Sequence, residues 1–279
     1  MNSNSKNITF SKVKSISCRK VKSIKSKFCI FLRHLSIPVT ANDFRLRLYK
    51  GRYPNKRCFI VGSGPSMKIE YLERLKHEYT FSANQIFRCF GSTAWRPNFY
   101  VIGDSNIGEI HKTSILGSDM KRIFVSSHMA PILNNDSRII YFNKTHEDYT
   151  DSPPLFSSNC LERVEGGYTV SYLAMQLAWY MGFREIYTIG IDAKYSSIIK
   201  QVVAESGDYT LVKSDSTESY FLPSMIQPDE PTYIPLPDRQ ILAYQSTKEY
   251  IETHGGVIYN AAPESPLEVF KRVEFDSLF

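Results

Sequence analysis

The sequence has few of the features that mark secreted, zinc-binding or membrane-spanning proteins. Its five cysteines are scattered, and no two of them have C-x-x-C spacing, so neither a disulfide framework nor a zinc knuckle is indicated. The longest apolar run near the N-terminus, residues 28–32, is too short for the roughly 7–15 apolar residues of a signal peptide or the roughly 20 of a membrane span. We therefore expect reduced thiols in a cytoplasmic protein.

Acidic residues are missing from residues 1–42, which hold nine lysines and arginines. Removing those nine charges from the net charge of +6 leaves −3 for residues 43–279. Apolar residues recur between the lysines at roughly helical spacing. We therefore expect residues 1–45 to be a basic leader, either a disordered tail or an amphipathic helix on an anionic membrane surface. In the second case the protein would be peripheral on the inner face of the membrane; nucleic acid is not an expected partner.

From Arg57 onward, short apolar runs alternate with helix-like stretches, which is the pattern of a parallel α/β sheet. Several runs lack polar alternation and are rich in Ile, Val, Phe and Tyr, as strands covered on both faces are. We predict that residues 46–279 form a single α/β, Rossmann-like domain with a mostly parallel sheet and helices on both faces. The expected strands are 58–61, 79–83, 99–102, 122–126, 138–142, 185–191 and 257–260, and the expected helices follow Pro65 and span about 168–181 and 238–254.

Residues 193–237 interrupt this rhythm. They show few strand or helix signals and contain five prolines. A long irregular segment inside a compact domain is usually functional, so we predict a lid over a binding site, with a disordered insertion as the alternative.

The segment CFIVGSGPSM, residues 58–67, places two glycines directly after the first predicted strand. Pro65 suits the first position of the next helix, whose N-terminus would present unpaired N–H groups to an anion. Gly62, Ser63, Gly64, Pro65 and Ser66 are therefore expected to form either a phosphate cradle or an ordinary tight turn. Neither the G-x-G-x-x-G fingerprint nor the P-loop is present.

Polar residues also follow other predicted strands. Asn84 follows the second strand, Asp104 the third, and Asp192 the strand that ends in Gly190. In an open parallel sheet, ligands bind outside the carboxyl ends of the strands, so these groups would meet in one crevice. Each aspartate taken alone is also typical of a turn or a helix cap. Gly166 and Gly167 open the predicted buried helix and add a second helix N-terminus to the same place.

The chain resembles the bacterial family of the 6-hydroxymethylpterin diphosphokinase MptE-like domain over roughly residues 56–279. Three segments carry the resemblance: FIVGSGPSM, GGYTVSYLAMQLAWYMGFREIYTIGID and YNAAPESPLEVFKRVEFDSLF. This family is related to the family forty-two sialyltransferases and to motility accessory factors. The resemblance implies a metal-independent, inverting glycosyltransferase of surface-polysaccharide or glycoprotein biosynthesis. Such an enzyme takes a sugar, sialic-acid-like among the candidates, from a CMP-linked donor and transfers it to a glycan acceptor.

The resemblance also implies site residues. It places the cytidine nucleotide on Gly62, Ser63, Gly64 and Asn84, with Gly190 and Asp192 lining the same site. The general base of the sialyltransferases is a histidine after the corresponding strand, whereas residues 193–237 of this chain contain none. Asp192 and Asp104 could each act as the base if a dry site raised their pKa, and we choose Asp192; Tyr195 and Tyr220 are expected to hydrogen-bond the leaving phosphate.

Two other functions stay open. One is a diphosphokinase-like phosphotransferase acting on a pterin, which would need Mg²⁺ as a cofactor, whereas the glycosyltransferase would need none. The other is a nucleotide-binding module without catalysis. Oligomerisation is compatible with either.

Overall fold

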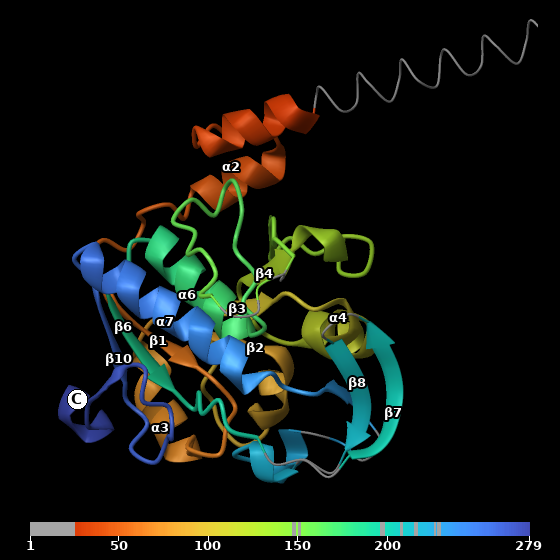
Figure 1. Cartoon of the computed structure of the whole chain (residues 1–279), viewed down its shortest axis with the longest axis vertical. Coiled ribbons are helices and arrows are strands. Elements are labelled where there is room, and N and C mark those ends of the chain that lie inside the picture. The colour runs from red at the N-terminus through yellow and green to blue at the C-terminus, as the bar shows by residue number, and fades with distance from the viewer. Residues whose placement is uncertain are drawn as a thin grey trace, which may run out of the picture.

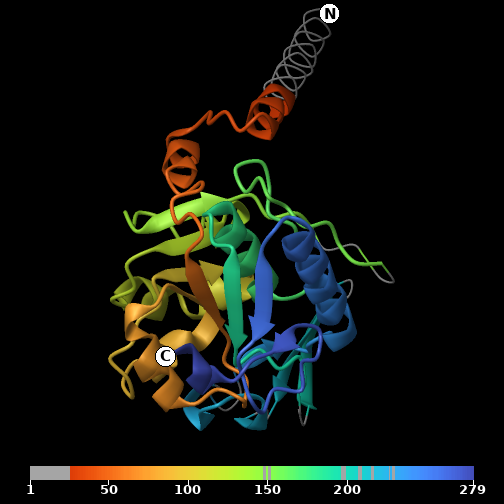
Figure 2. The same cartoon turned by 90° about the vertical axis from the view of Figure 1, so that its left-hand side faces the viewer.

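The computed structural model shows one large sheet with helices on both faces (Figures 1 and 2). It describes residues 26–146, 149, 152–195, 199–206, 209–214, 217–225, 227 and 230–279. All strand pairs of the large sheet are parallel, and the strand order is β11-β10-β6-β1-β2-β3-β4-β5. The predicted Rossmann-like fold is confirmed. The strands are β1 (Arg57–Val61), β2 (Thr80–Ala83), β3 (Phe99–Ile102), β4 (Ile123–Ser126), β5 (Ile139–Phe142), β6 (Glu185–Ile189), β10 (Val257–Asn260) and β11 (Lys271–Arg272).

The side chains of β1 show how the sheet is covered. Cys58 and Ile60 belong to the apolar cluster under α6 and α7, whereas Phe59 and Val61 belong to the cluster under α3, α4 and α5. Because both faces are buried, the strands carry continuous apolar runs. The helices are α2 (Ala41–Arg47), α3 (Ile69–Arg74), α4 (Ser105–Ile110), α5 (Lys112–Gly117), α6 (Val170–Tyr180) and α7 (Pro237–Thr253). The 3₁₀ turns are η1 (Leu75–His77), η2 (Asn84–Cys89), η3 (Ser127–Met129), η4 (Thr217–Ser219), η5 (Pro223–Met225) and η6 (Phe275–Leu278).

The strand order reverses beside β1. From β1 the chain adds β2 to β5 in one direction, and then returns through α6 to place β6 on the other side of β1. A crevice opens outside the carboxyl ends of the strands at such a reversal, and ligands of doubly wound sheets bind there. The fold therefore assigns the candidate site to the ends of β1 and β6.

The prediction that residues 193–237 are irregular is wrong. They contain a three-stranded antiparallel sheet formed by β7 (Ile199–Ser206), β8 (Tyr209–Ser214) and β9 (Pro231–Tyr233). β7 and β8 are two runs that are rich in β-branched residues, on either side of a Gly-Asp pair, and all five prolines lie after them, so the prolines were not evidence against these strands. Figure 1 shows β7 and β8 lying as a hairpin next to α4.

An ion cluster attaches this segment to the body. The Arg88 guanidinium donates to the Glu230 carboxylate at 2.6 Å and to the Met225 carbonyl at 2.8 Å. His111 Nε2 lies 2.7 Å from the other Glu230 oxygen, although neither atom has a partner at hydrogen-bond geometry among the described residues. Burial lowers the pKa of His111, so Arg88 is the cation that balances Glu230 at neutral pH.

The N-terminal helices join the body along the edge strand β5. Residues 26–34 are helical, and α2 follows after a Thr40–Asp43 capping box. The Asn42 side chain pairs with the N–H and the carbonyl of Tyr141, in place of a neighbouring strand. The predicted boundary between leader and domain falls inside α2, and residues 1–25 lie outside the described residues. No helix in the described ranges is both long and apolar enough to cross a membrane.

Replacing Glu230 by Ala should lower the free energy of unfolding by about 3 kcal/mol, because it leaves Arg88 partly buried and unpaired. Urea denaturation measures this loss. The matched control is Glu264→Ala, which breaks the exposed pair with Lys68 and should leave the free energy of unfolding nearly unchanged. Equal losses for the two variants would show that the Glu230 cluster does not hold the segment.

Candidate active site

Three adjoining cavities run along the carboxyl ends of the strands. The inner one, of 150 Å³, lies at the ends of β1 and β6, the middle one has 210 Å³, and the outer one, of 500 Å³, lies at the ends of β3, β4 and β5. The inner and middle cavities share Asn84, Thr169 and Tyr195 in their walls, and the middle and outer cavities share Asp104 and Lys144. The cavities therefore form one continuous crevice.

The glycine turn after β1 packs against the end of β6. The N–H groups of Gly62 and Gly64 donate to the carbonyls of Ile189 and Gly190, each at 2.8 Å. A Cβ on Gly62 would lie 2.2 Å from the Gly190 oxygen, so this glycine is required by contact between two stretches of backbone. The Ser63 N–H has no hydrogen-bond acceptor among the described residues, which leaves it available at the inner cavity.

Asp192 closes this turn from the other side. Its carboxylate accepts hydrogen bonds from the N–H and the hydroxyl of Ser66, at 2.9 and 2.5 Å. A Cβ on Gly64 would lie 2.3 Å from the same carboxylate. The anion expected at this turn is thus supplied by the protein itself. The predicted helix does not begin at Pro65 either, since Pro65 and Ser66 form a turn and α3 begins at Ile69.

A longer helix N-terminus faces the same crevice. Thr169, Val170 and Ser171, at the start of the 11-residue helix α6, line the inner cavity. The Thr169 hydroxyl caps the helix by accepting from the Ser171 N–H at 3.3 Å. This N-terminus carries roughly half a positive charge, so an anion in the inner cavity would be stabilised. The predicted Gly166 and Gly167 precede it.

Those two glycines fix the approach of the chain to α6. The Gly166 N–H donates to the Thr145 hydroxyl at 3.0 Å. A Cβ on Gly167 would lie 2.3 Å from the Tyr172 ring, so only glycine lets the chain pass. Their role is to position α6.

Three non-glycine residues with positive φ line the crevice. Asn84, Tyr168 and Ala193 have φ values of 51°, 53° and 48°, and all three line the inner or middle cavity. Such values are uncommon outside glycine and cost roughly 1–3 kcal/mol each. Gly190 adopts φ 67° in the same wall. Asn84, predicted from its place after β2, is therefore a lining residue; asparagine adopts this φ more readily than other non-glycine residues, so the strain is concentrated at Tyr168 and Ala193.

Two predicted tyrosines come from the segment after β6. The Tyr195 hydroxyl donates to Gln240 at 2.8 Å, and both Tyr195 and Tyr220 line the inner and middle cavities. The Tyr195 side chain is exposed, and its hydroxyl is held by the bond to Gln240. Loss of hydration raises the pKa of both phenols, so they are protonated hydrogen-bond donors at neutral pH.

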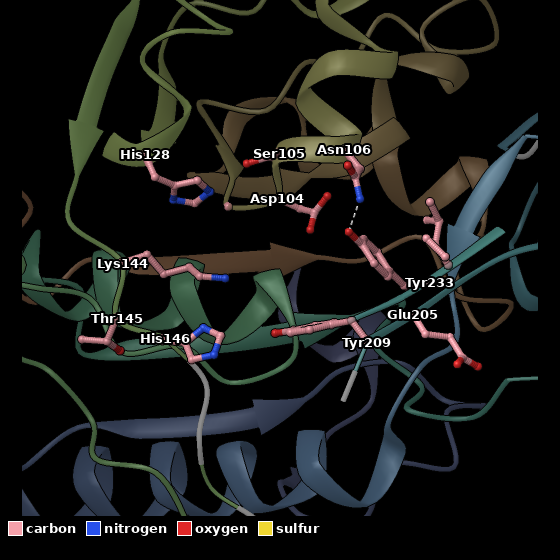
Figure 3. Close-up of a pocket in the computed structure, with 13 residues that line it drawn as sticks. Asp104, Ser105, Asn106, His128, Lys144, Thr145, His146, Glu205, Tyr209 and Tyr233 are labelled. Carbon is pink, nitrogen blue, oxygen red and sulfur yellow. Dashed lines mark hydrogen bonds between the residues drawn. The ribbon is translucent and has the colours of Figure 1, made fainter. Parts of the chain in front are cut away.

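The outer cavity holds charged and imidazole side chains that sequence reasoning missed. Figure 3 shows His128, Lys144 and His146 pointing toward the space beside Asp104. His128 Nδ1 lies 2.7 Å from the hydroxyl of buried Ser126, which fixes the ring. These residues follow β4 and β5 directly. The strand-end rule that selected Asp104 would also have selected them.

Asp104 lies opposite this group. Its carboxylate caps α4 by accepting from the Ile107 N–H at 2.9 Å. Burial raises the pKa of Asp104, and the hydrogen bond from Ile107 and the nearby charge of Lys144 offset part of this effect. The charged form of Asp104 is therefore destabilised.

Aromatic rings form a row beside the middle and outer cavities. Tyr149, Tyr168, Tyr209 and Tyr233 follow one another with ring centroids 5.2, 5.6 and 5.6 Å apart. The Tyr233 hydroxyl accepts a hydrogen bond from the Asn106 amide (Figure 3). Rings with polar groups at their edges suit a ligand that presents both C–H faces and hydroxyls. Within the ranges that the structure describes, no group of three or more His, Cys, Asp or Glu could hold a metal ion.

Comparison with a family model supports the resemblance seen in the sequence. The family described as 6-hydroxymethylpterin diphosphokinase MptE-like matches residues 17–197. The match begins within the basic leader and ends just after β6, so it includes the glycine turn, Asp104 and Asp192. A search of curated proteins found no match.

The chain is also similar to solved structures. One is the MAf glycosyltransferase from Magnetospirillum magneticum AMB-1, with 15% identity and a TM-score of 0.49 over 85% of this chain; the chain spans only 38% of that protein. A second is the sialyltransferase CstII from Campylobacter jejuni in complex with the substrate analogue CMP-3FNeuAc, with 14% identity and a TM-score of 0.42 over 78% of this chain and 86% of that one. A third is sialyltransferase CST-II with a trisaccharide acceptor and CMP, with 17% identity and a TM-score of 0.43 over 77% and 85%.

Replacing Asp104 by Asn should stabilise the protein at neutral pH, because the raised pKa means that the charged carboxylate costs free energy in the folded state. Asparagine retains the oxygen that caps α4. As the pH falls through the folded pKa toward the ordinary value near 4, the wild-type carboxyl gains its proton and the advantage should vanish. Urea denaturation at several pH values measures this.

The matched control is Asp136→Asn, which should destabilise the protein at neutral pH. The Arg138 guanidinium beside Asp136 lowers the pKa of that carboxyl, so its charge contributes stability above pH 4 that is lost in acid. If Asp104→Asn destabilises the protein at neutral pH as Asp136→Asn does, the charge of Asp104 is stabilising, and its role is to cap α4.

Proposed function

The chain belongs to the 6-hydroxymethylpterin diphosphokinase MptE-like family, and we propose that it is a glycosyltransferase that takes its sugar from a nucleotide-linked donor. The observation that carries the proposal is the continuous crevice. One end is a small polar cavity between two strand ends and a helix N-terminus, and the other is a 500 Å³ pocket with aromatic and hydrogen-bonding walls. These two ends fit two different substrates, an anionic donor and a hydroxyl-rich acceptor.

The donor phosphate lies in the inner cavity under this proposal. The N-terminus of α6 supplies positive potential at Thr169–Ser171, and the Ser63 N–H supplies a donor from the glycine turn. Asn84, between the inner and middle cavities, offers an amide to the nucleoside without repelling phosphate. Cytidine is the first base to test, because the sequence resemblance includes sialyltransferases and the similar CstII structure holds a CMP-sugar analogue.

The sugar lies in the middle cavity and the acceptor in the outer one. As the bond between the anomeric carbon and the phosphate oxygen breaks, charge develops on the phosphate, and the hydroxyl of Tyr220 donates to it, joined by that of Tyr195 once its proton turns from Gln240 to the phosphate. The tyrosine row and Asn106 hold the acceptor, whose hydroxyl attacks from the opposite side and inverts the anomeric centre. This chemistry requires no metal.

A proton must leave the acceptor hydroxyl, and two groups are candidates to accept it. Asp192 was expected from the sequence, but both of its oxygens accept hydrogen bonds from Ser66, which makes it a positioning residue for the turn. His128 stands in the outer cavity, with one ring nitrogen fixed by Ser126 and the other edge turned toward Asp104 (Figure 3). We assign the role of general base to His128 and keep Asp192 as the alternative.

The family description favours a second candidate function, a pterin diphosphokinase. Transfer of a diphosphoryl group normally uses Mg²⁺ held by carboxylates. Asp104 and Asp192 both line the crevice, although each also binds backbone N–H groups. A binding module without catalysis is the third candidate. The three candidate functions differ in the nucleotide that they are expected to bind or cleave.

CMP without metal should raise the melting temperature by a few degrees when it is present at about 100 times its dissociation constant. Asn84→Gly should abolish this shift, because it removes the amide while glycine tolerates the positive φ. Asn55→Gly is the matched control, with φ 56° at an exposed turn, and should retain the shift. Stabilisation by ATP with Mg²⁺ and not by CMP would favour the diphosphokinase.

His128→Asn should lower the rate of CMP release from CMP-N-acetylneuraminic acid, with water as acceptor, by about 10²-fold or more while KM changes little. The acid limb of the wild-type pH profile should disappear in this variant. His77→Asn, an exposed histidine on η1, should behave as wild type.

The same assay tests the alternative base. If His128→Asn retains the wild-type rate and pH profile while Asp192→Asn loses the rate without losing the CMP shift, the base is Asp192. CMP binding without release from any sugar donor would instead favour a module that lacks catalysis.

A further inference from the structure

Exposed apolar side chains are concentrated in the N-terminal helices. Fourteen large apolar residues of the described chain are exposed, and seven of them lie between residues 28 and 48. Phe28 and Phe31 are more than half exposed, as are Phe44 and Leu48 on and beside α2. Soluble proteins rarely expose such a contiguous group without an interaction partner. The seven, which we call the N-terminal apolar surface, are Phe28, Ile30, Phe31, Leu35, Ile37, Phe44 and Leu48.

This surface is held in place by polar contacts on its inner side. The Arg33 guanidinium donates to Asp43 at 2.8 Å, which links the helix at residues 26–34 to α2. The Asn159 amide donates to the carbonyls of Arg33 and His34, at 3.0 and 3.1 Å. The polar groups of the segment bind the body and each other, and Leu46 is buried in the core, while the seven residues of the N-terminal apolar surface are exposed.

The surface lies far from the crevice. Figure 2 shows the N-terminal helices at one end of the molecule, with the arrows of β6 and β10 pointing toward the other end. The β7–β8 hairpin lies at that other end in both views (Figures 1 and 2). A partner bound to the N-terminal helices would therefore leave the crevice open to solvent.

The basic residues around the N-terminal apolar surface indicate an anionic partner. Lys27, Arg45, Arg47 and Lys50 accompany the apolar residues, whereas Asp43, the acid of α2, is buried against Arg33. Residues 1–25 add seven lysines and arginines and no acid. Apolar residues among basic ones are the composition of segments that insert into the headgroup region of anionic bilayers. A second copy of the chain would bring two strongly basic surfaces together, which charge repulsion disfavours.

We propose that the N-terminal apolar surface and the surrounding lysines and arginines bind the surface of a membrane rich in anionic lipids. The apolar side chains enter the interface, while the basic ones contact lipid phosphates. Attraction to the lipid charge should weaken as salt rises. The inference does not depend on the proposed glycosyltransferase activity.

Co-sedimentation of the full chain with vesicles tests the proposal. We expect binding to vesicles of phosphatidylglycerol and phosphatidylcholine, and binding on the order of tenfold weaker to phosphatidylcholine alone or in high salt. The triple variant Phe28→Ser, Phe31→Ser, Leu35→Ser should lose binding. The matched control, Ile110→Ser, Leu155→Ser, Val257→Ser, changes three exposed apolar residues elsewhere and should retain it. The thermal melting of each variant establishes that it is folded.

A second variant, Lys27→Gln with Arg47→Gln, keeps every apolar side chain and should weaken binding to the anionic vesicles selectively. Equal binding of wild type to both kinds of vesicle, or equal loss in the control triple variant, would overturn the proposal. A concentration-dependent dimer that the Phe28, Phe31, Leu35 variant abolishes, without any lipid binding by wild type, would overturn it in favour of self-association.

Discussion

The hydrogen bonds between Asp192 and Ser66 are the interaction on which the crevice depends. They join the turn after β1 to the turn after β6, at the point where the strand order reverses. Gly62 and Gly64 let the two turns approach within backbone contact, and Gly190 takes the positive φ that carries the chain away from β6. With this junction closed by an internal carboxylate, the N-terminus of α6 is the element of the inner cavity that we propose as the anion-binding site.

Other residues of the site adopt conformations or charge states that lower the stability of the fold. Tyr168 and Ala193 adopt backbone conformations that non-glycine residues avoid, and Asp104 keeps a carboxylate where burial opposes its charge. The strongly apolar layers on both faces of the sheet offset these costs. Strain and buried charge are commonly retained where function requires them, so their concentration around one crevice supports the same location as the topology does.

The sequence was sufficient for most of the sheet, because most residues of β1 to β6 are buried and each of these strands is rich in apolar side chains. It was insufficient for β7 and β8, whose described side chains are mostly exposed or half-buried and form no long apolar run, and for β9 and β11, which have three and two residues. Asn84 and Asp104 were predicted from their positions after strands, Tyr195 and Tyr220 were named after comparison with the resembled family, and all four line the crevice. The role of Asp192 could not be predicted, because it depends on the contact with Ser66, 126 residues away.

The central claim is that a nucleotide phosphate binds between the glycine turn and the start of α6. Amide chemical-shift mapping by NMR during a titration with CMP tests it most directly. The account predicts that the largest shift changes occur at Ser63, Asn84 and Thr169–Ser171, with smaller ones in the outer cavity. Saturating changes confined to other parts of the chain, or no changes at any CMP concentration, would contradict it.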